Sequence, residues 1–374
     1  MVNKERLIER FIELVKIDSE TKHEGAIATY LKDELTALDV EVEEDQAKEK
    51  TDHGANNLIC TLKGTDPHSR TIFFSSHMDT VTPGKNVKPH RKDGYITSDG
   101  TTILGADDKA GIAVFFELIH ILKEQNLPHG DIQFIITVGE EAGLNGAKAL
   151  DRSLVKADFG YVLDSDGAVG NLVVRAPYQS KFHVTIYGKS AHAGVEPEKG
   201  ISAITTAAKA ISKMKLGRID EETTANISYF KGGKKEATNI VTEYVEIEGE
   251  ARSLEKKKLD DIIAHITNHF ETTAEKFGAK TDLKLIEAYP GYKLQENEEV
   301  VQIAQQAAHN LQLTSELLTS GGGSDANIFN SFNLPTANLS VGYEEIHTTK
   351  ERISEEELVR LTKLVVEIVK LAFK

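Results

Sequence analysis

Histidines and acidic residues follow several apolar segments of the chain, at positions where they could bind metal ions. His77 and Asp79 follow the run TIFFSS, and Asp107 and Asp108 follow TTILGA. Three further segments share this arrangement: Glu140 and Glu141 after DIQFIITVG, Asp164 at the end of FGYVLD, and His347 after TANLSVG and YEEI. Imidazole and carboxylate groups suit zinc, with cobalt or manganese as substitutes. Any one of these acids could be a turn residue or helix cap, but together they indicate metal-dependent hydrolysis.

The number of candidate ligands predicts a site for two metal ions. Two imidazoles and three carboxylates are available, from His77, Asp107, Glu141, Asp164 and His347. If one carboxylate bridges, each ion receives one histidine and one further acid, and two ions about 3.5–4 Å apart form a common hydrolytic arrangement. The adjacent Glu140 is then free to act as a general base. His77 and Asp79 lie two residues apart in an extended segment, so the Asp79 carboxylate could orient the His77 ring.

A parallel sheet would bring these segments together. Residues 1 to about 176 alternate helical patterns, near 3–17, 23–38, 109–125 and 143–151, with the strand-like runs NNLICTLKG, TIFFSS, DIQFIITV and FGYVLD. This alternation is typical of an α/β fold with a largely parallel sheet. Ligands bind at the carboxyl ends of such strands, so the five segments converge there if the apolar runs, TTILGA included, are parallel strands.

A different order of elements interrupts this pattern. Residues 177–288 read as strand, helix, strand, strand, helix and strand, which is the order of a ferredoxin-like β-α-β-β-α-β unit. The α/β pattern resumes with helices over NEEVVQIAQQAAHNLQL, NIFNSF and residues 354–373, and with the strand TANLSVG. We therefore expect a discontinuous catalytic domain, residues 1–176 and 289–374, with a second domain inserted at 177–288.

The composition excludes several classes of partner. The 374 residues carry a net charge of -15, which argues against nucleic acid or an anionic membrane surface as a partner. The single cysteine, Cys60, rules out an internal disulfide framework and fits a reducing compartment. No apolar run approaches the ~20 residues needed to span a bilayer, and the first residues do not form a signal peptide. We expect a cytoplasmic protein.

The string GGGSDA at 321–326 allows a competing interpretation as a dinucleotide-binding oxidoreductase. Only about ten residues separate it from the next strand, too few for the crossover helix of such a unit. The backbone N–H groups around Gly322, at the start of a helix, could instead bind an anionic substrate group. A non-catalytic binding protein would lack Glu140 or a ligand, and none of these residues is missing.

The motifs that contain these residues resemble a known enzyme family. They are SSHMDTV, GADDKAG, TVGEEAGLNGAKAL, YVLDSDG, GKSAHAGVEPEKGISAI, GGGSDANIF and EEIHTTKERI, spread over nearly the whole chain. The sequence resembles the dinuclear zinc peptidases that include peptidase T, the bacterial carboxypeptidase G type and succinyl-diaminopimelate desuccinylase, and is most similar to peptidase T-like proteins. The resemblance implies that His77 and Asp164 hold one zinc ion, that Glu141 and His347 hold the other, and that the Asp107 carboxylate bridges the two ions. It also implies that the peptide bond between Asp107 and Asp108 is cis.

The resemblance also implies roles for the inserted domain. This domain would be a lid and would form a homodimer, in which His192 reaches the neighbouring active site and stabilises the oxyanion. Asn239 and Arg252 match lid positions that contact substrate. From sequence alone, His192 could simply cap a strand and Arg252 could lie on a solvated face. The implied function is hydrolysis of a peptide bond in short peptides, as in an aminopeptidase; a carboxypeptidase or N-acyl-amino-acid amidohydrolase remains an alternative.

Overall fold

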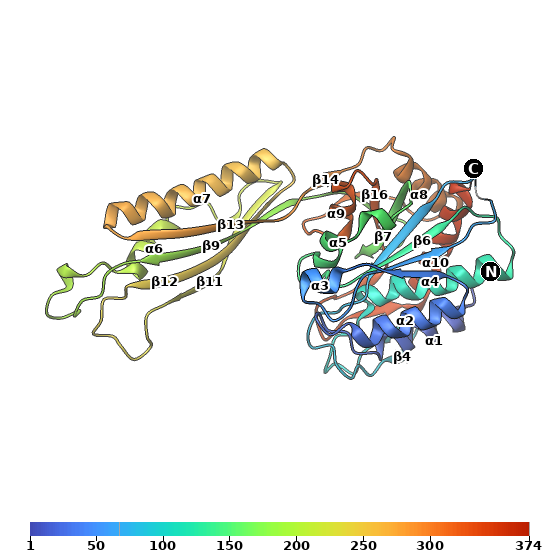
Figure 1. The fold of residues 1–374 in the computed structure, drawn as a ribbon, viewed down its shortest axis with the longest axis horizontal. Helices are drawn as coiled ribbons and strands as arrows, with labels where there is room; N and C mark the ends of the chain where they lie inside the picture. The colour runs from blue at the N-terminus through green and yellow to red at the C-terminus, as the bar shows by residue number, and fades with distance from the viewer. Residues whose placement is uncertain (67, 374) are drawn as a thin grey trace. The chain divides into compact units, whose positions relative to one another are not determined.

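Two units, each with its own sheet, make up residues 1–66 and 68–373, which the computed structural model describes (Figure 1). Unit 1 consists of Met1–Arg175, Lys293–Ser320 and the residues from Ser324 onward. Unit 2 consists of Ala176–Tyr292 and Gly321–Gly323. The polypeptide therefore forms most of unit 2 in one continuous segment and contributes only Gly321–Gly323 to it later.

A nine-stranded sheet forms the centre of unit 1. The strand order is β1-β2-β6-β3-β7-β16-β8-β14, with β15 beside β8. The four central strands, β6, β3, β7 and β16, are parallel to one another, whereas β1 and β2 pair antiparallel at one edge. The largely parallel sheet predicted from the sequence is confirmed. The strands are β1 (Glu41–Glu44), β2 (Leu58–Leu62), β3 (Ile72–His77), β6 (Ile132–Thr137), β7 (Phe159–Ser165), β8 (Leu172–Ala176), β14 (Tyr292–Lys293), β15 (Leu317–Thr319) and β16 (Thr336–Ser340).

Strands β3, β6 and β16 are buried along their whole length, and β7 is buried up to Leu163, as expected for a parallel sheet covered by helices. Helix α4 lies against β3 and β7 and also packs against α1 and α10. Asn3 caps α1 by accepting a hydrogen bond from the backbone N–H of Arg6. Among the described residues, no helix has the length and apolarity to cross a membrane. The helices of unit 1 are α1 (Lys4–Val15), α2 (Gly25–Ala37), α3 (Ala47–Thr51), α4 (Ala106–Glu124), α5 (Asn145–Ala149), α8 (Glu299–Asn310), α9 (Asp325–Ser331) and α10 (Glu355–Ala372).

A second, smaller sheet in unit 1 was not predicted from the sequence. It has the order β17-β18-β5-β4, and all of its pairs are antiparallel. Its strands are very short: β4 (His90–Lys92), β5 (Tyr95–Thr97), β17 (Tyr343–Glu344) and β18 (Arg352–Ser354). The loop between β17 and β18 carries His347, so this sheet fixes both ends of a segment with a candidate ligand.

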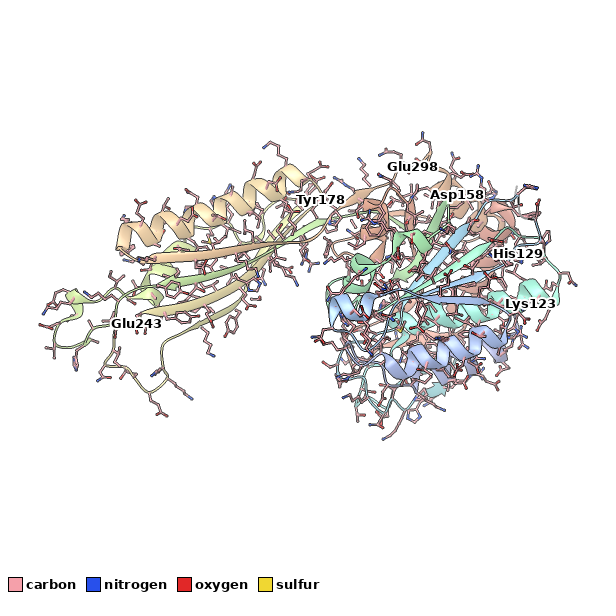
Figure 2. The ribbon with its side chains drawn as sticks, in the orientation of Figure 1. Lys123, His129, Asp158, Tyr178, Glu243 and Glu298 are labelled. Atoms are coloured by element: carbon pink, nitrogen blue, oxygen red, sulfur yellow. The ribbon has the colours of Figure 1, made fainter. Side chains whose placement is uncertain are left out.

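Unit 2 has the β-α-β-β-α-β order predicted from the sequence, with one additional two-residue strand, β10, after its first α-helix. Its antiparallel sheet has the order β10-β11-β12-β9-β13. Tyr178, at the start of β9, and Glu243, just before β12, mark the two ends of this sheet (Figure 2). Phe182, Val184 and Ile186 alternate along β9 and share a buried core with α6 and α7. The elements are β9 (Tyr178–Tyr187), α6 (Ala203–Ile211), β10 (Gly217–Arg218), β11 (Thr223–Gly232), β12 (Tyr244–Ser253), α7 (Lys256–Phe277) and β13 (Lys280–Tyr289).

Candidate metal centre

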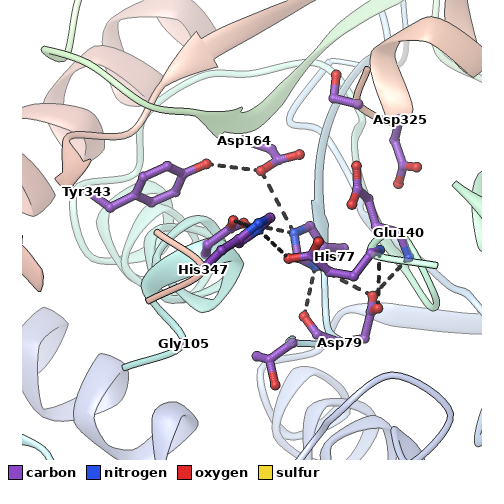
Figure 3. Close-up of polar contacts among 12 residues, drawn as sticks. His77, Asp79, Gly105, Glu140, Asp164, Asp325, Tyr343 and His347 are labelled. Atoms are coloured by element: carbon purple, nitrogen blue, oxygen red, sulfur yellow. Dashed lines mark hydrogen bonds and ion pairs between the residues drawn. The ribbon is translucent and has the colours of Figure 1, made fainter. Parts of the chain in front are cut away.

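Most of the predicted ligands lie at the carboxyl ends of the central parallel strands of unit 1 (Figure 3). His77 is the last residue of β3, and Asp164 is the next-to-last residue of β7. Glu140 and Glu141 lie in the turn that follows β6. His347 follows β16 at a greater distance along the chain, in the loop after β17. Ligands of open α/β sheets bind at these carboxyl ends of the strands.

Asp107 reaches the same place from the start of a helix. The prediction that the apolar run before it is a strand is wrong: α4 begins at Ala106, with Gly105 as its N-cap at a φ of 80°. Asp107 and Asp108 have non-helical backbone angles within the first turn, and the peptide bond between them is cis. From Thr102 onward the run TTILGA is buried, and it leads into a helix that is itself buried on almost every side.

The two carboxylate oxygens of Asp107 divide the cluster into two halves. Oδ1 of Asp107 lies 3.0 Å from Nε2 of His77, which is 3.8 Å from Oδ1 of Asp164. Oδ2 of Asp107 lies 3.1 Å from Nε2 of His347, which is 2.9 Å from Oε1 of Glu141. Each half therefore offers one imidazole nitrogen, one Asp107 oxygen and one further carboxylate oxygen.

These distances fit a pair of divalent metal ions. Ligand atoms about 2.0–2.2 Å from a tetrahedral ion lie roughly 3.3–3.6 Å from one another. The ligand atoms of His77, Asp107 and Asp164 all lie within 4.8 Å of one another, and so do those of Asp107, Glu141 and His347. A third such group, with His77 and Glu141, includes Glu140. The donor set and its spacing are thus suited to two ions that share Asp107.

Comparison with known proteins places the chain in a family. The model of peptidase family M20/M25/M40 matches residues 73–371. The chain belongs to this peptidase family. It is 57% identical over its full length, and the full length of the relative, to the uncharacterized protein YqjE of Bacillus subtilis (strain 168). It is 29% identical to peptidase T of Lysinibacillus sphaericus, with 98% of each chain covered.

Solved structures give the same result for this M20 peptidase. The aminopeptidase PepT from Bacillus cereus is 56% identical, with a TM-score of 0.93 and 99% of each chain covered. A tripeptidase from Staphylococcus aureus is 51% identical, with a TM-score of 0.96, and covers 100% of this chain and 99% of its own. At 18% identity, Bacillus subtilis YXEP, described as a dinuclear metal-binding M20 peptidase, shares the fold, with a TM-score of 0.75 and coverage of 99% and 98%. The predicted peptide hydrolase and its likeness to peptidase T are confirmed.

Asp79 holds the turn that carries two of the acids. Nδ1 of His77 donates to the backbone carbonyl oxygen of Asp79 at 2.8 Å, and Oδ1 of the Asp79 carboxylate lies 3.5 Å from the same nitrogen. The backbone makes the shorter contact with the ring, and the orienting role of the carboxylate stays a prediction. The Asp79 carboxylate also accepts the backbone N–H groups of Glu140 at 3.0 Å and Glu141 at 3.3 Å, and the hydroxyl of Thr21 at 2.8 Å.

Burial and close packing shift the pKa values of the acidic residues in the site. Burial, reinforced by Asp107, raises the pKa of Asp164 well above its usual value, and burial with Asp164 does the same for Glu140. Burial would also raise the pKa of Asp107, but the hydrogen bonds of His347 and His77 outweigh it and lower that pKa. The same bond to Asp107, together with Glu141, raises the pKa of His347 to about 10. Burial and mutual repulsion thus increase the affinity of Asp164 and Glu140 for a positive partner, which a proton or a cation can supply.

Two further residues lie near the cluster, and no role was predicted for them from the sequence. The Tyr343 hydroxyl donates to Oδ1 of Asp164 at 3.0 Å (Figure 3). Asp325, the first residue of α9, is buried, and Oδ2 accepts the Thr137 hydroxyl at 2.5 Å. Burial raises the pKa of Asp325 to about 6. Asp325 could have been suspected from the sequence, since it is an acid directly after a glycine-rich run. Tyr343 could not, because tyrosines are common next to strands.

The glycine run, Gly321–Gly323, directly precedes the N-cap of α9 as predicted, and its role in binding an anionic group stays a prediction. Ser324 is the N-cap of α9 and forms a capping box with Asn327, so the first turn of this helix is already capped by the protein. Gly322 precedes that cap by two residues and belongs to unit 2, where the neighbouring Gly321 carbonyl oxygen accepts a hydrogen bond from Arg252 at 3.3 Å. The glycine run and Arg252 thus lie together in this M20 peptidase.

The remaining predicted residues lie at the two ends of unit 2. Arg252, near the end of β12, also donates from Nε to Oε1 of Glu250 at 2.8 Å. His192 is exposed and pairs as an isolated bridge with Ile240, while the carbonyl oxygen of Asn239 accepts the backbone N–H of Ala193 at 2.8 Å. His192 and Asn239 therefore adjoin each other, but the sheet separates them from Arg252.

Proposed function

We propose that this M20 peptidase is a two-metal aminopeptidase that releases the N-terminal residue of short peptides. One observation carries the metal part of the proposal: Asp107 shares its two oxygens between His77 and His347, each of which has a further carboxylate beside it. The aminopeptidase PepT at 56% identity and the tripeptidase at 51% identity support the substrate class.

Five residues would hold the ions in this proposal. His77 and Asp164 would bind one ion, Glu141 and His347 the other, and Asp107 both. Nδ1 of His77 is engaged by a backbone carbonyl oxygen, which leaves Nε2 as the ligand atom. We propose zinc as the native metal, with cobalt or manganese as substitutes, because the donors are mixed nitrogen and oxygen. When bound, the two cations would polarise the scissile carbonyl group and make a water molecule more acidic.

Glu140 would act as the general base. Its neighbour Glu141 is a proposed ligand, and the Asp79 carboxylate fixes the backbone of both residues. Burial, together with Asp164, raises the pKa of Glu140, so the carboxylate has an increased affinity for a proton. Glu140 would accept a proton from the attacking water and transfer it to the nitrogen of the leaving amine.

Unit 2 would provide the substrate contacts and the homodimer. The chain connects unit 2 to unit 1 at Ala176 and Tyr292, at the same end of the sheet as Arg252, which pairs with Gln179. His192 follows the other end of β9, about 30 Å farther along the strand. We therefore propose that His192 serves the active site of a second copy and stabilises the oxyanion there, while Arg252 binds a carboxylate of the substrate and Asn239 contacts it.

A comparison of blocked and unblocked substrates tests the proposed activity. The zinc- or cobalt-loaded protein is incubated with an unblocked tripeptide, with the same tripeptide acetylated at its N-terminus, and with N-acetyl amino acids, and products are identified by mass spectrometry. We expect release of the N-terminal residue from the unblocked tripeptide, and none from the acetylated form. Release of the C-terminal residue, or cleavage of N-blocked substrates alone, would replace this assignment with a carboxypeptidase or an N-acyl-amino-acid hydrolase.

A further inference from the structure

A buried carboxylate outside the candidate ligands holds the segment that carries Asp107. Glu351 is 1% exposed. Its Oε2 accepts the backbone N–H groups of Leu104 at 2.7 Å and Gly105 at 2.8 Å. Its Oε1 accepts the backbone N–H of Asp107 at 3.0 Å. One carboxylate therefore fixes three backbone positions immediately before and at the shared ligand.

These N–H groups need an acceptor from elsewhere in the chain. Leu104, Gly105 and Asp107 are buried, so water does not satisfy them. The first N–H groups of an α-helix have no partner within the helix, and the non-helical angles of Asp107 and Asp108 extend the irregular segment into the first turn of α4. Buried backbone donors are rarely left without a partner in native proteins. Glu351 is the side chain that meets this requirement.

The same short loop contacts Asp107 at both its backbone and its side chain. His347 and Glu351 are four residues apart in the connection from β17 to β18, and the backbone N–H of Glu351 donates to the Thr348 carbonyl oxygen at 3.1 Å. Nε2 of His347 lies 3.1 Å from the Asp107 carboxylate, while Glu351 holds the Asp107 backbone N–H. The loop thus fixes where the Asp107 carboxylate lies relative to His347.

We propose that Glu351 is a positioning residue of the metal centre, which acts through Asp107 to keep that carboxylate between the two halves of the site. This inference rests on the proposed two-metal site. It goes beyond that site because Glu351 is not a ligand: both of its oxygens are occupied by backbone N–H groups. Hydrogen-bonding partners of metal ligands typically affect metal affinity about 10–100-fold.

The test compares two isosteric substitutions on buried glutamates. Glu351→Gln places an amide N–H opposite at least one backbone N–H group. Glu117→Gln is the matched control. Glu117 is also 1% exposed and accepts hydrogen bonds from the Asn3 backbone N–H and from Nε of Arg6, each at 2.7 Å. It lies on α4, ten residues after Asp107. Zinc dissociation constants are measured by competition with a chromogenic chelator, and unfolding by circular dichroism.

We expect both variants to lose stability, but only Glu351→Gln to bind zinc about 10–100-fold more weakly than the wild type. If Glu351→Gln does not fold, Glu351→Asp, which keeps the charge on a shorter side chain, is expected to show the same weakening. Dissociation constants within about twofold of the wild type in the Glu351 variants would overturn the inference. A wild-type protein that binds no metal pair would instead overturn the proposed function itself.

Discussion

Carboxylates occupy two contrasting environments in this molecule. In unit 1, the side chains of Asp107, Glu141 and Asp164 are each at most 10% exposed and lie close to one another. In unit 2, Asp261 on α7 is 65% exposed and pairs with Lys257 one turn earlier, at 2.7 Å. An exposed ion pair of this kind contributes little to stability, because water solvates both charges. Buried like charges, in contrast, require protons or cations to neutralise them.

The contrast shows what makes an acidic cluster informative. The many acids of α7 are typical of a solvated helix face, with lysines at i,i+4 spacing. The acids at the carboxyl ends of the strands are held in place by neighbouring groups, such as the Tyr343 hydroxyl and the Glu351 carboxylate. Such supporting contacts are characteristic of a site organised for binding.

The largest expected effect in the buried cluster follows from Glu140→Gln. The amide keeps the size of the side chain but cannot accept the proton, so we expect kcat to fall about 100- to 10,000-fold. The metal content should be unchanged, because the five proposed ligands are intact. Steady-state kinetics and elemental analysis of the same preparation check both points. A kcat within about threefold of the wild type would remove Glu140 from the role of base.

A smaller and more local effect is expected from Tyr343→Phe. This change removes the hydroxyl that donates to Asp164 at 3.0 Å, so the ion held by His77 and Asp164 should bind about tenfold more weakly. The ion held by Glu141 and His347 should be unaffected. Calorimetric titration of the apo-protein separates the two affinities. Tyr95→Phe is the control, since its hydroxyl contacts Glu344 at 3.4 Å instead. An equal loss at both sites would contradict the assignment of Asp164 to one half.

The smallest effect is expected on the solvated helix. Lys257→Ala breaks the pair with Asp261, whose partners are both mostly exposed, so the unfolding temperature should stay within about 1 °C of the wild type. Raising the salt concentration should reduce even this difference. Thermal unfolding at low and high ionic strength provides the measurement. A large loss of stability or of activity would show that the contrast between the two regions is drawn incorrectly.

The sequence predicts the fold and the contents of the buried cluster for one reason. His77, Glu141 and Asp164 each end or follow an apolar run, and parallel strands bring such positions to one edge. The β-α-β-β-α-β order of unit 2 was predictable because its four main strands have 10 residues each and show a clear periodicity. In contrast, β4, β5, β17 and β18 have two or three residues each, too few to show any periodicity.

What the sequence does not predict depends on local backbone geometry. The Asp79 carboxylate was expected beside His77, but the sequence does not show that it also accepts the N–H groups of the turn after β6. The helix start at Ala106 depends on the left-handed angle of Gly105. Glu351 lies in the charged stretch KERISEEE, which is typical of a solvated surface. In the fold it is buried, with hydrogen bonds to a segment more than 240 residues earlier in the chain.

The most direct test of the two-metal site is anomalous diffraction from crystals of the zinc-loaded protein, collected on both sides of the zinc absorption edge. We predict two anomalous peaks per chain, about 3.5–4 Å apart, one beside His77 and Asp164 and one beside His347 and Glu141, with Asp107 between them. A single peak, or two peaks that do not share Asp107, would contradict the account.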